Sequence, residues 1–365
     1  MEILTTVLSI TLISGSLAVI ISIAERFLNN YGECEIDINQ GNKVLKVTGG
    51  SSLLSSLGSQ KIFIPSACGG KATCGLCKVA VLEGAGPLLP TEEPYLTQDE
   101  IAKNYRLSCQ IKVKRNLKIM IPEELFSIRE YVTTIEELSD LTHDIKFMRL
   151  KLAEGEEISF KAGQYVQLHS KPYAKIKETA FRAYSVASVP SDKTHVDLIV
   201  RLVPEGIVTT YTHTMLKVGD NVSISGPYGD FYLRGDCSEI VMIAGGSGLA
   251  PMRSIILDVL EKKLDLKMVF FFGAVTKKDL YYLDYFAAIA AENPNFTFIP
   301  ALSKPEPTDE WTGELGLITE VVARHVPDAV SREAYLCGSP GMINACLKVL
   351  DSKGFSSDKI YFDKF

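Results

Sequence analysis

The chain has no excess of positive charge. Its 38 Lys and Arg stand against 44 Asp and Glu, so the formal net charge is −6. A nucleic-acid-binding protein uses a basic surface to neutralise phosphates, and this balance gives no reason to expect a nucleic-acid partner. The apolar share of 46% and the charged share of 22% are ordinary for folded domains. They exclude intrinsic disorder, a collagen-like fibre and a multi-span membrane protein.

Long hydrophobic runs are missing everywhere except at the N-terminus. Residues 3–24 carry no charge. As a helix of about 1.5 Å per residue they reach roughly 33 Å, enough for a bilayer core of about 30 Å. A secretory signal begins with basic residues and ends at a small-residue cleavage site, whereas Glu2 stands second here and no such site follows. We therefore expect one retained transmembrane helix within residues 1–27, with a cleaved signal or a buried core helix as the alternatives.

The rest of the chain is too long for one small core. At about 100–200 residues per domain, 365 residues predict two or three domains. Shifts in pattern place a cysteine-bearing α+β domain at residues 28–124, a domain of short strands at 125–233, and a domain of alternating strands and helices at 234–365. The predicted architecture is a multidomain chain behind an N-terminal anchor.

No disulfide framework is visible among the eight cysteines, but four of them form a pattern. Cys68, Cys74 and Cys77 lie in the glycine-rich loop SACGGKATCGLC, and Cys109 comes from a later segment. Three thiolates in a tight loop plus one distant thiolate suit a 2Fe-2S cluster, because one loop can wrap two irons. Structural zinc usually uses two short C-x2–4-C pairs, and disulfides need an oxidising compartment, so both are weaker alternatives.

The flanking segments predict an α+β fold around this loop. The elements that we expect are a hairpin of Glu35–Ile38 with Lys43–Thr48, a helix at Leu53–Leu57, a strand at Lys78–Leu82, a helix at Thr91–Ala102 with Thr91 as its N-cap, and a strand at Ile111–Val113. The arrangement resembles the 2Fe-2S ferredoxin fold, a β-grasp fold. Its first cysteine gap has five residues, where plant-type ferredoxins have four.

Residues 125–233 read as short strands separated by turn signals, which is typical of an antiparallel barrel. The expected strands are Glu130–Ile135, Ile145–Leu152, Gln164–Leu168, Ala183–Ala187, Val196–Leu202 and Asn221–Ser225. A flavin dinucleotide needs a fixed cation for its pyrophosphate and a hydroxyl near its redox nitrogen. Arg182 can supply a forked donor, Tyr184 can stack on the cofactor, and Ser185 can reach N5. Gly206 leaves backbone N–H groups of the next helix open to phosphate.

This barrel resembles that of the ferredoxin–NADP reductase superfamily, which carries R-x-Y-S and a later G-x-x-S/T. The resemblance implies FAD contacts from Arg182, Tyr184 and Ser185, and a phosphate cradle formed by Gly206, Ile207, Val208 and Thr209. Arg201 belongs to the same set by order and spacing. An ion-paired arginine in an ordinary strand is the alternative for the tetrapeptide alone.

From residue 234 on, strands alternate with helices, which predicts a parallel, doubly wound α/β sheet that binds NAD(P). The expected strands are Glu239–Ala244, Lys267–Phe272, Phe296–Ala301, Ala334–Leu336 and Lys359–Tyr361, and the expected helices are Pro251–Lys262, Asp279–Ala291, Leu315–Val322 and Met342–Lys353. The glycine-rich turn after the first strand predicts a pyrophosphate site, with Pro251 at the first helical position. Its residues are Gly245, Gly246, Ser247 and Gly248.

The segment from Cys337 to Met342 is similar to the superfamily's C-G-P-x-x-M motif, which implies that Cys337 lies beside the hydride-transfer site together with Gly338. A small core cysteine is the alternative. We assign hydride transfer to Ser185, Ser247 and Cys337. Many relatives place a C-terminal aromatic over the flavin ring, which implies that role for Phe365, with a frayed tail as the alternative.

Over essentially its whole length the chain resembles the family of F subunits of sodium-translocating NADH:quinone reductases. The resemblance implies a membrane-anchored oxidoreductase that passes electrons from NADH to FAD, then to a 2Fe-2S cluster, then to a quinone or integral-membrane acceptor subunits. The short segment between His169 and Arg182 departs from the family. Lys277, Lys278 and Asp279 leave NADH against NADPH open from the residues alone, and the resemblance favours NADH.

Two other functions remain open from the sequence. One is the reductase component of an oxygenase, or a stand-alone NAD(P)H reductase, and the other is a redox sensor without reductase activity. NADH and reduced thiolates belong in the cytoplasm. The predicted location is therefore the inner (plasma) membrane, with a single pass and the soluble domains on the cytoplasmic side.

Overall fold

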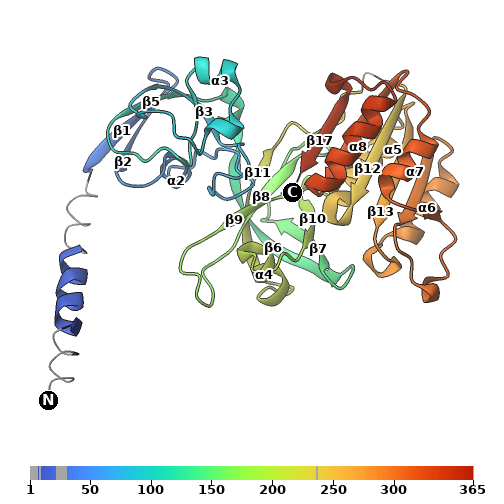
Figure 1. The fold of residues 1–365 in the computed structure, drawn as a ribbon, viewed down its shortest axis with the longest axis horizontal. Coiled ribbons are helices and arrows are strands. Elements are labelled where there is room, and N and C mark those ends of the chain that lie inside the picture. The colour runs from blue at the N-terminus through green and yellow to red at the C-terminus, as the bar shows by residue number, and fades with distance from the viewer. Residues whose placement is uncertain (1–6, 8–9, 22–30, 236, 365) are drawn as a thin grey trace. The chain divides into compact units, whose positions relative to one another are not determined.

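The computed structural model describes residues 7, 10–21, 31–235 and 237–364 (Figure 1). The chain divides into two compact units, with the boundary between Ile128 and Arg129. Residues 10–21 are helical, and part of the anchor predicted over residues 1–27 lies outside the described residues. Within the described ranges, no helix has the length and apolar character needed to cross a membrane. The predicted domain boundaries stay predictions.

The first unit contains a mixed five-stranded sheet in the order β2-β1-β5-β3-β4. Strand β1 pairs antiparallel with β2 and parallel with β5, which gives the grasp topology of a ferredoxin domain. Apolar residues alternate along β1, so Ile36 and Ile38 are fully buried, as are Leu53 and Leu57 of α2. The elements are β1 (Glu33–Ile38), β2 (Lys43–Thr48), α2 (Leu53–Ser59), β3 (Lys78–Glu83), η1 (Glu93–Tyr95), α3 (Gln98–Ala102), β4 (Tyr105–Leu107) and β5 (Leu117–Met120).

The helix predicted over Thr91–Ala102 is wrong in its start and its continuity. The backbone is extended at Leu96, and α3 begins after Thr97, which is its N-cap in place of Thr91. The Thr97 hydroxyl accepts from the N–H of Glu100, and the Glu100 carboxylate accepts from the N–H of Thr97. This reciprocal capping box is a stronger start signal than a lone threonine.

The strand predicted at Ile111–Val113 is also wrong. Only one isolated bridge, between Ser52 and Lys112, forms there, and the strand of this region is β5. Ile111 and Val113 are nevertheless buried. Their alternation reflects burial of a loop that runs beside α2, and this pattern cannot be told from a short strand in the sequence alone.

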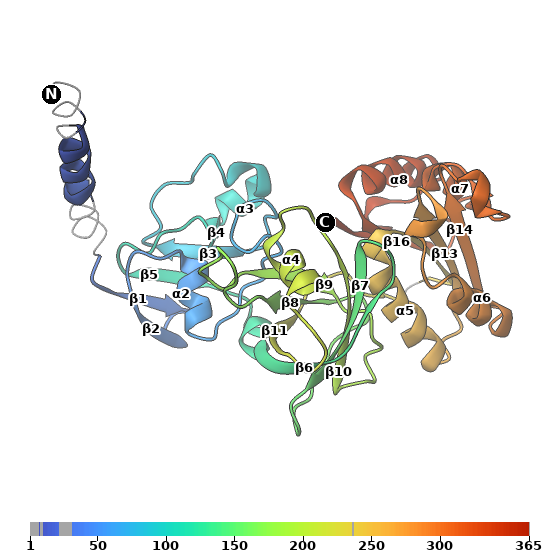
Figure 2. The same ribbon diagram turned by 90° about the horizontal axis from the view of Figure 1, so that it is seen from below.

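The first half of the second unit is an antiparallel six-stranded sheet in the order β10-β7-β6-β11-β8-β9 (Figure 2). A bridge between Val186 and Leu198 joins β9 to β10 and closes the sheet into the predicted barrel. Helix α4 (Ile207–Thr214) packs against it through Val208 and Tyr211. The strands are β6 (Arg129–Asp140), β7 (Ile145–Leu152), β8 (Tyr165–His169), β9 (Phe181–Ser185), β10 (His195–Arg201) and β11 (Asn221–Tyr228).

The second half is a parallel six-stranded sheet in the order β15-β14-β13-β12-β16-β17. Successive residues of β12 face opposite cores: Met242 packs in a cluster with α5 and α6, and Ile243 in one with α7 and α8. The doubly wound prediction is thereby confirmed. The elements are β12 (Glu239–Gly245), η3 (Gly246–Gly248), α5 (Leu249–Glu261), β13 (Lys267–Ala274), η4 (Lys277–Asp279), α6 (Leu283–Glu292), β14 (Phe296–Leu302), β15 (Glu314–Leu315), α7 (Ile318–His325), β16 (Arg332–Gly338), α8 (Pro340–Ser352) and β17 (Ile360–Lys364).

Pro251 is the third residue of α5, so its predicted first position is wrong. The glycine turn tightens into η3, and the α-helix starts two residues earlier than expected. Proline is still tolerated, because the N–H groups of a first helical turn have no partner inside the helix.

Candidate functional site

The four patterned cysteines come together in two pairs. The Cys68 and Cys74 sulfurs lie 3.4 Å apart within the loop. A thiol hydrogen bond also joins Cys77, at the end of the loop, to Cys109 from the segment after β4. Two pairs of sulfurs are the donor set for two adjacent irons, each of which takes two thiolates. No group of three or more His, Cys, Asp or Glu side chains in the described part of the chain is gathered to hold a single metal ion.

Backbone N–H groups of the loop point at these sulfurs. Those of Lys71 and Thr73 hydrogen-bond to Cys68, and that of Ala72 to Cys109. Gly75 has φ +69°, and an added Cβ there would lie 2.9 Å from the Tyr95 side chain. Glycine is required at this position for both conformation and space. The loop is therefore shaped to surround negatively charged sulfur with amide donors.

The sulfur pairs perturb one another's acidity. The hydrogen bond from Cys74 lowers the pKa of Cys68 to about 3, and the bond from Cys77 lowers the pKa of Cys109 to about 7. The same contacts, together with burial, raise the pKa of Cys74 and that of Cys77. In each pair the contact thus favours the thiolate form of one cysteine, Cys68 or Cys109, over that of its partner. A thiolate is the form that ligates iron, so this donor set fits the cluster.

The barrel places the R-x-Y-S tetrapeptide on β9. Arg182 and Tyr184 alternate onto one face, opposite Leu168 and Val166 of β8, and Ser185 pairs with Tyr165. The Tyr184 hydroxyl is buried and has no hydrogen-bond partner among the described residues, and burial raises its pKa. An orphaned buried hydroxyl beside an arginine fits a bound flavin that supplies the missing partner.

The start of α4 fits a phosphate. Gly206 is its N-cap, and no side chain of the described residues caps the helix. Ile207, Val208 and Thr209 follow as the first helical turn. A Cβ on Gly206 would lie 2.5 Å from Thr209 Oγ1, so glycine keeps the backbone open there. Tyr173, which sequence reasoning missed, donates a 2.6 Å hydrogen bond to the carbonyl of Ile207 and holds the preceding loop over this turn.

In the parallel sheet, the glycine turn and the Cys337 segment lie against each other. An added Cβ on Gly248 would lie 2.1 Å from the Cys337 carbonyl oxygen. Gly245 lies against Met342, whose sulfur would be 3.0 Å from an added Cβ, and the Met342 methyl would be 2.7 Å from one on Gly338. The structure therefore brings these predicted residues together. Ser247 lies in the same turn, half-buried.

Arg201, the last residue of β10, also lies against the glycine turn. Its Nη1 would lie 3.3 Å from a Cβ on Gly246, and its Nε donates to Asp144 over 2.8 Å. Tyr281, which sequence reasoning missed, donates to the Gly246 carbonyl over 2.8 Å. No hydrogen bond or ion pair of the described residues joins Ser185 to this group. Phe365 lies outside the described residues.

Cys337 is fully buried, and burial raises the pKa of its thiol. It is therefore a neutral thiol at physiological pH and not a nucleophile. In the parallel register of β16 and β17 its partner is Asp363, which sequence reasoning missed. Burial raises the pKa of Asp363 to about 6. A carboxyl group two residues before the last residue gives no sequence signal of its own.

We expect Asp363 to make stability fall as pH rises. The folded state holds its proton more tightly than the unfolded chain, so stability is lost between the ordinary pKa of 3.8 and about 6. In urea unfolding, Asp363→Asn should match the wild type near pH 4 and exceed it by about 1–2 kcal/mol at pH 8. A difference that is the same at both pH values would contradict this.

The lysines after β13 are already engaged. Lys277 Nζ donates to the Asp309 carbonyl over 2.8 Å, and Lys278 Nζ lies 3.7 Å from Glu306. Asp279 accepts from the N–H and hydroxyl of Thr276 within its own turn. Glu306 and Asp309 lie beside the two lysines, and their negative charge disfavours a 2′-phosphate at the carboxyl end of β13. This agrees with NADH as the nucleotide.

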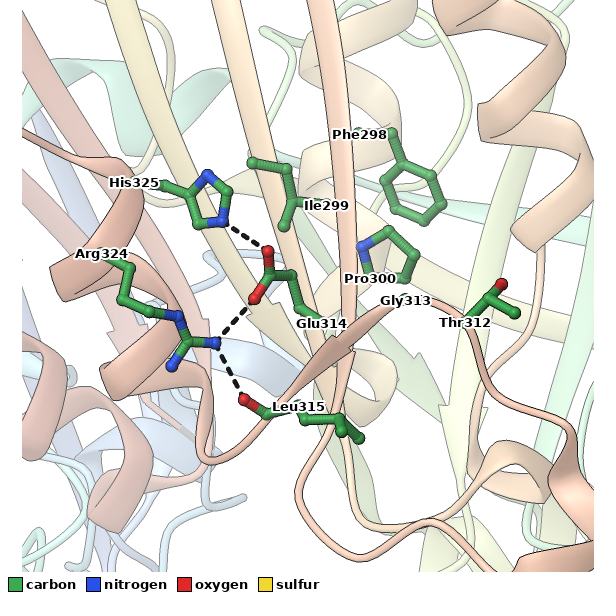
Figure 3. A pocket seen from close by; sticks show the side chains of 9 residues that line it. All are labelled: Phe298, Ile299, Pro300, Thr312, Gly313, Glu314, Leu315, Arg324 and His325. Atoms are coloured by element: carbon green, nitrogen blue, oxygen red, sulfur yellow. Dashed lines mark hydrogen bonds and ion pairs between the residues drawn. The ribbon is translucent and has the colours of Figure 1, made fainter.

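A hollow of about 490 Å³ lies beside the edge strand β15, which covers only part of β14 (Figure 3). Glu314 there accepts hydrogen bonds from His325 and Arg324 over 2.7 and 2.6 Å. None of the predicted site residues lines this hollow. The paired carboxylate holds β15 to α7.

Family comparisons match all three parts of the chain. Residues 36–114 match the family described as 2Fe-2S iron-sulfur cluster binding domain, residues 132–232 the oxidoreductase FAD-binding domain, and residues 242–348 the oxidoreductase NAD-binding domain. The chain is 37% identical over 406 residues to the F subunit of the Na(+)-translocating NADH-quinone reductase of Pasteurella multocida, with all of both chains covered. It is 36% identical to the F subunit of Methylococcus capsulatus, with 99% of that protein covered.

Solved structures share the fold. The cytochrome P450 reductase of Amycolatopsis superposes with a TM-score of 0.72 and 29% identity over 91% of this chain and 98% of that one. The ferredoxin reductase of carbazole 1,9a-dioxygenase gives 0.69 and 25% over 92% and 98%. These likenesses place a ferredoxin domain, a flavin barrel and a nicotinamide domain in one chain.

Proposed function

Because the chain belongs to the family of F subunits of Na(+)-translocating NADH-quinone reductases, we propose that it is the NADH-oxidising subunit of such a complex. It takes electrons from NADH and delivers them one at a time to quinone-reducing partners at the membrane. The full-length match to these F subunits, with three cofactor domains in one chain, carries this proposal.

When bound, FAD supplies acceptance of a hydride, and the 2Fe-2S cluster supplies transfer of single electrons. The chain's own residues hold and shield these groups. Cys68 with Cys74, and Cys77 with Cys109, would ligate the irons. Arg182, Tyr184 and the first turn of α4 would hold FAD.

The glycine turn would hold NADH. Arg201 and Tyr281 both lie against Gly246, so two side chains help to fix the turn. Cys337 is neutral and buried, and its backbone carbonyl lies next to Gly248, so it would pack behind the glycine turn and help to exclude water from the place where nicotinamide meets flavin. Ser247, in the glycine turn, would lie at the same place as Cys337, and Ser185, on β9, would contact the flavin. Phe365 would cover the ring.

The membrane part of the proposal depends on residues 3–24. This uncharged stretch supports a single-pass anchor in the inner membrane, with the three domains on the cytoplasmic side where NADH is found. Integral-membrane subunits that accept electrons are the partners. Gentle solubilisation should recover the chain together with such subunits, and salt washing alone should not release it. Release by salt would contradict the anchor.

An anaerobic NADH titration of the purified full chain tests the redox proposal. We expect about one flavin and two irons per chain, bleaching of the flavin by NADH, and reduction of the cluster after it. Flavin that stays oxidised in excess NADH would contradict the proposal and favour a sensor. The two structural neighbours support one alternative, a reductase for an oxygenase, at the level of the fold. Release from membranes by salt would favour that alternative.

A further inference from the structure

A buried carboxylate, Asp197, lies where the flavin barrel meets the nicotinamide sheet. It is on β10 and only 3% of its side chain is exposed. Arg149 Nη1 donates to it over 2.9 Å, and Arg253 Nη1 donates to it over 3.2 Å. The two arginines come from different places. Arg149 is the cross-strand neighbour of Asp197 on β7, whereas Arg253 is on α5 of the nicotinamide sheet.

Further hydrogen bonds tie α5 to the segment that follows β9. Arg253 Nη1 donates to the carbonyl of Ala187 over 2.5 Å, and the Ser254 hydroxyl donates to the carbonyl of Ser188 over 2.6 Å. The Ser188 hydroxyl in turn accepts from the N–H of Asp197 over 3.1 Å. Two consecutive residues of one domain thus hold two consecutive carbonyls of the other.

These bonds connect the two segments where the proposed reaction takes place. Helix α5 starts directly after the glycine turn, and Ala187 is two residues beyond Ser185 of β9. A shift of α5 along the barrel would move the glycine turn relative to the flavin strand by the same amount.

The surroundings keep water away from the Asp197 carboxylate, whose side chain is 3% exposed. Ala187 and Met252 are fully buried in one apolar core that draws residues from both the barrel and α5. The Arg253 guanidinium lies 5.9 Å from the ring centres of Tyr282 and Tyr285. An apolar contact alone would let α5 slide to neighbouring positions on the barrel. A buried carboxylate that accepts from two arginines fixes a single position, because its hydrogen bonds need defined distances and angles.

We propose that Arg253 and Asp197 are positioning residues that fix the distance between the glycine turn Gly245–Gly248 and the flavin strand β9. This inference rests on the proposed function. Of the two arginines that bind Asp197, only Arg253 joins the nicotinamide sheet to the barrel, so the positioning depends on Arg253. Arg149 stabilises the same carboxylate from within the barrel.

The test compares Arg253→Met with Arg149→Met in the full-length holoprotein. Both variants leave Asp197 with one arginine, so both should lower the urea midpoint. Only Arg253→Met should slow flavin bleaching at saturating NADH, by about 10- to 100-fold, because a displacement near 1 Å costs that much. Its NADH dissociation constant should stay within about 2-fold, and the charge-transfer band between nicotinamide and flavin should weaken. Equal slowing in both variants, or none in Arg253→Met, would overturn the proposal.

A second readout does not need NADH. Trp311 is the single tryptophan and reports on the nicotinamide sheet, while flavin fluorescence reports on the barrel. The two unfolding transitions should coincide in the wild type and in Arg149→Met, and should separate in Arg253→Met. If the wild type does not react with NADH, the proposed function fails. The comparison of unfolding transitions still tests whether Arg253 holds the nicotinamide sheet to the barrel. Coincident transitions in Arg253→Met would then overturn it.

Discussion

Replacing Cys74 with alanine is expected to remove the iron–sulfur cluster while NADH still bleaches the flavin. The Cys74 sulfur lies 3.4 Å from that of Cys68, so the change removes one member of a donor pair and leaves an iron without its second thiolate from the loop. Alanine is chosen over serine because a hydroxyl can still ligate iron. Bound iron should fall from about two per chain to near zero.

The consequence for electron delivery should be large. Without a carrier of single electrons, NADH-driven quinone reduction should fall by at least about 100-fold, whereas the rate of flavin bleaching should stay within about 2-fold. Cys34→Ala is the matched control, because Cys34 is buried in the same domain, 2% exposed, and lies outside the loop. Iron content, visible spectrum and the two rates are the measurements. A Cys74→Ala protein that keeps its iron would contradict the ligand assignment.

Local signals in the sequence were sufficient for much of this site. The spacing of Cys68, Cys74 and Cys77 with intervening glycines describes a loop whose shape depends on few distant residues. The tetrapeptide at 182–185 indicated strand β9, although the strand begins and ends two residues earlier than predicted. A shift by two residues leaves each side chain on the same face of the strand. The alternation of strands and helices after residue 234 predicted the parallel sheet for the same reason.

The parts that could not be predicted depend on tertiary contacts. Nothing near Asp197 in the sequence indicates Arg253, because the two meet only when α5 packs on the barrel. Asp363 becomes part of the site through the pairing of β17 with β16. Arg201 was grouped with the flavin by its order in the chain, and its additional contact with Gly246 has no signal in the sequence.

Adding one methyl group at Gly248 is expected to slow the oxidation of NADH by at least about 100-fold. The backbone there has φ −61° and ψ −9°, which alanine adopts freely, so conformational strain plays no part. The new Cβ would lie 2.1 Å from the Cys337 carbonyl oxygen and 3.1 Å from the Gly338 nitrogen. Both are backbone atoms of β16, which cannot rotate away, so the glycine turn itself must move.

Such a movement acts directly on the site. Relief of the contact displaces the turn by roughly 1 Å, and a displacement of that size in a reacting centre costs about 100-fold in rate. Overpacking of this kind also costs about 1–3 kcal/mol of folding free energy. Gly248→Ala should therefore bleach its flavin at least about 100-fold more slowly than the wild type, while the cluster and bound FAD remain.

The control is Gly341→Ala in the same domain, because an added Cβ there meets nothing within 4 Å. It should keep the wild-type rate within about 2-fold and unfold at the wild-type urea concentration or above it, since alanine favours the helix α8. Dithionite reduces flavin without the nucleotide and should reduce both variants equally. The added Cβ must displace the turn, since it would otherwise overlap the Cys337 carbonyl oxygen. A Gly248→Ala protein with a normal NADH rate would therefore show that the turn does not hold the nicotinamide.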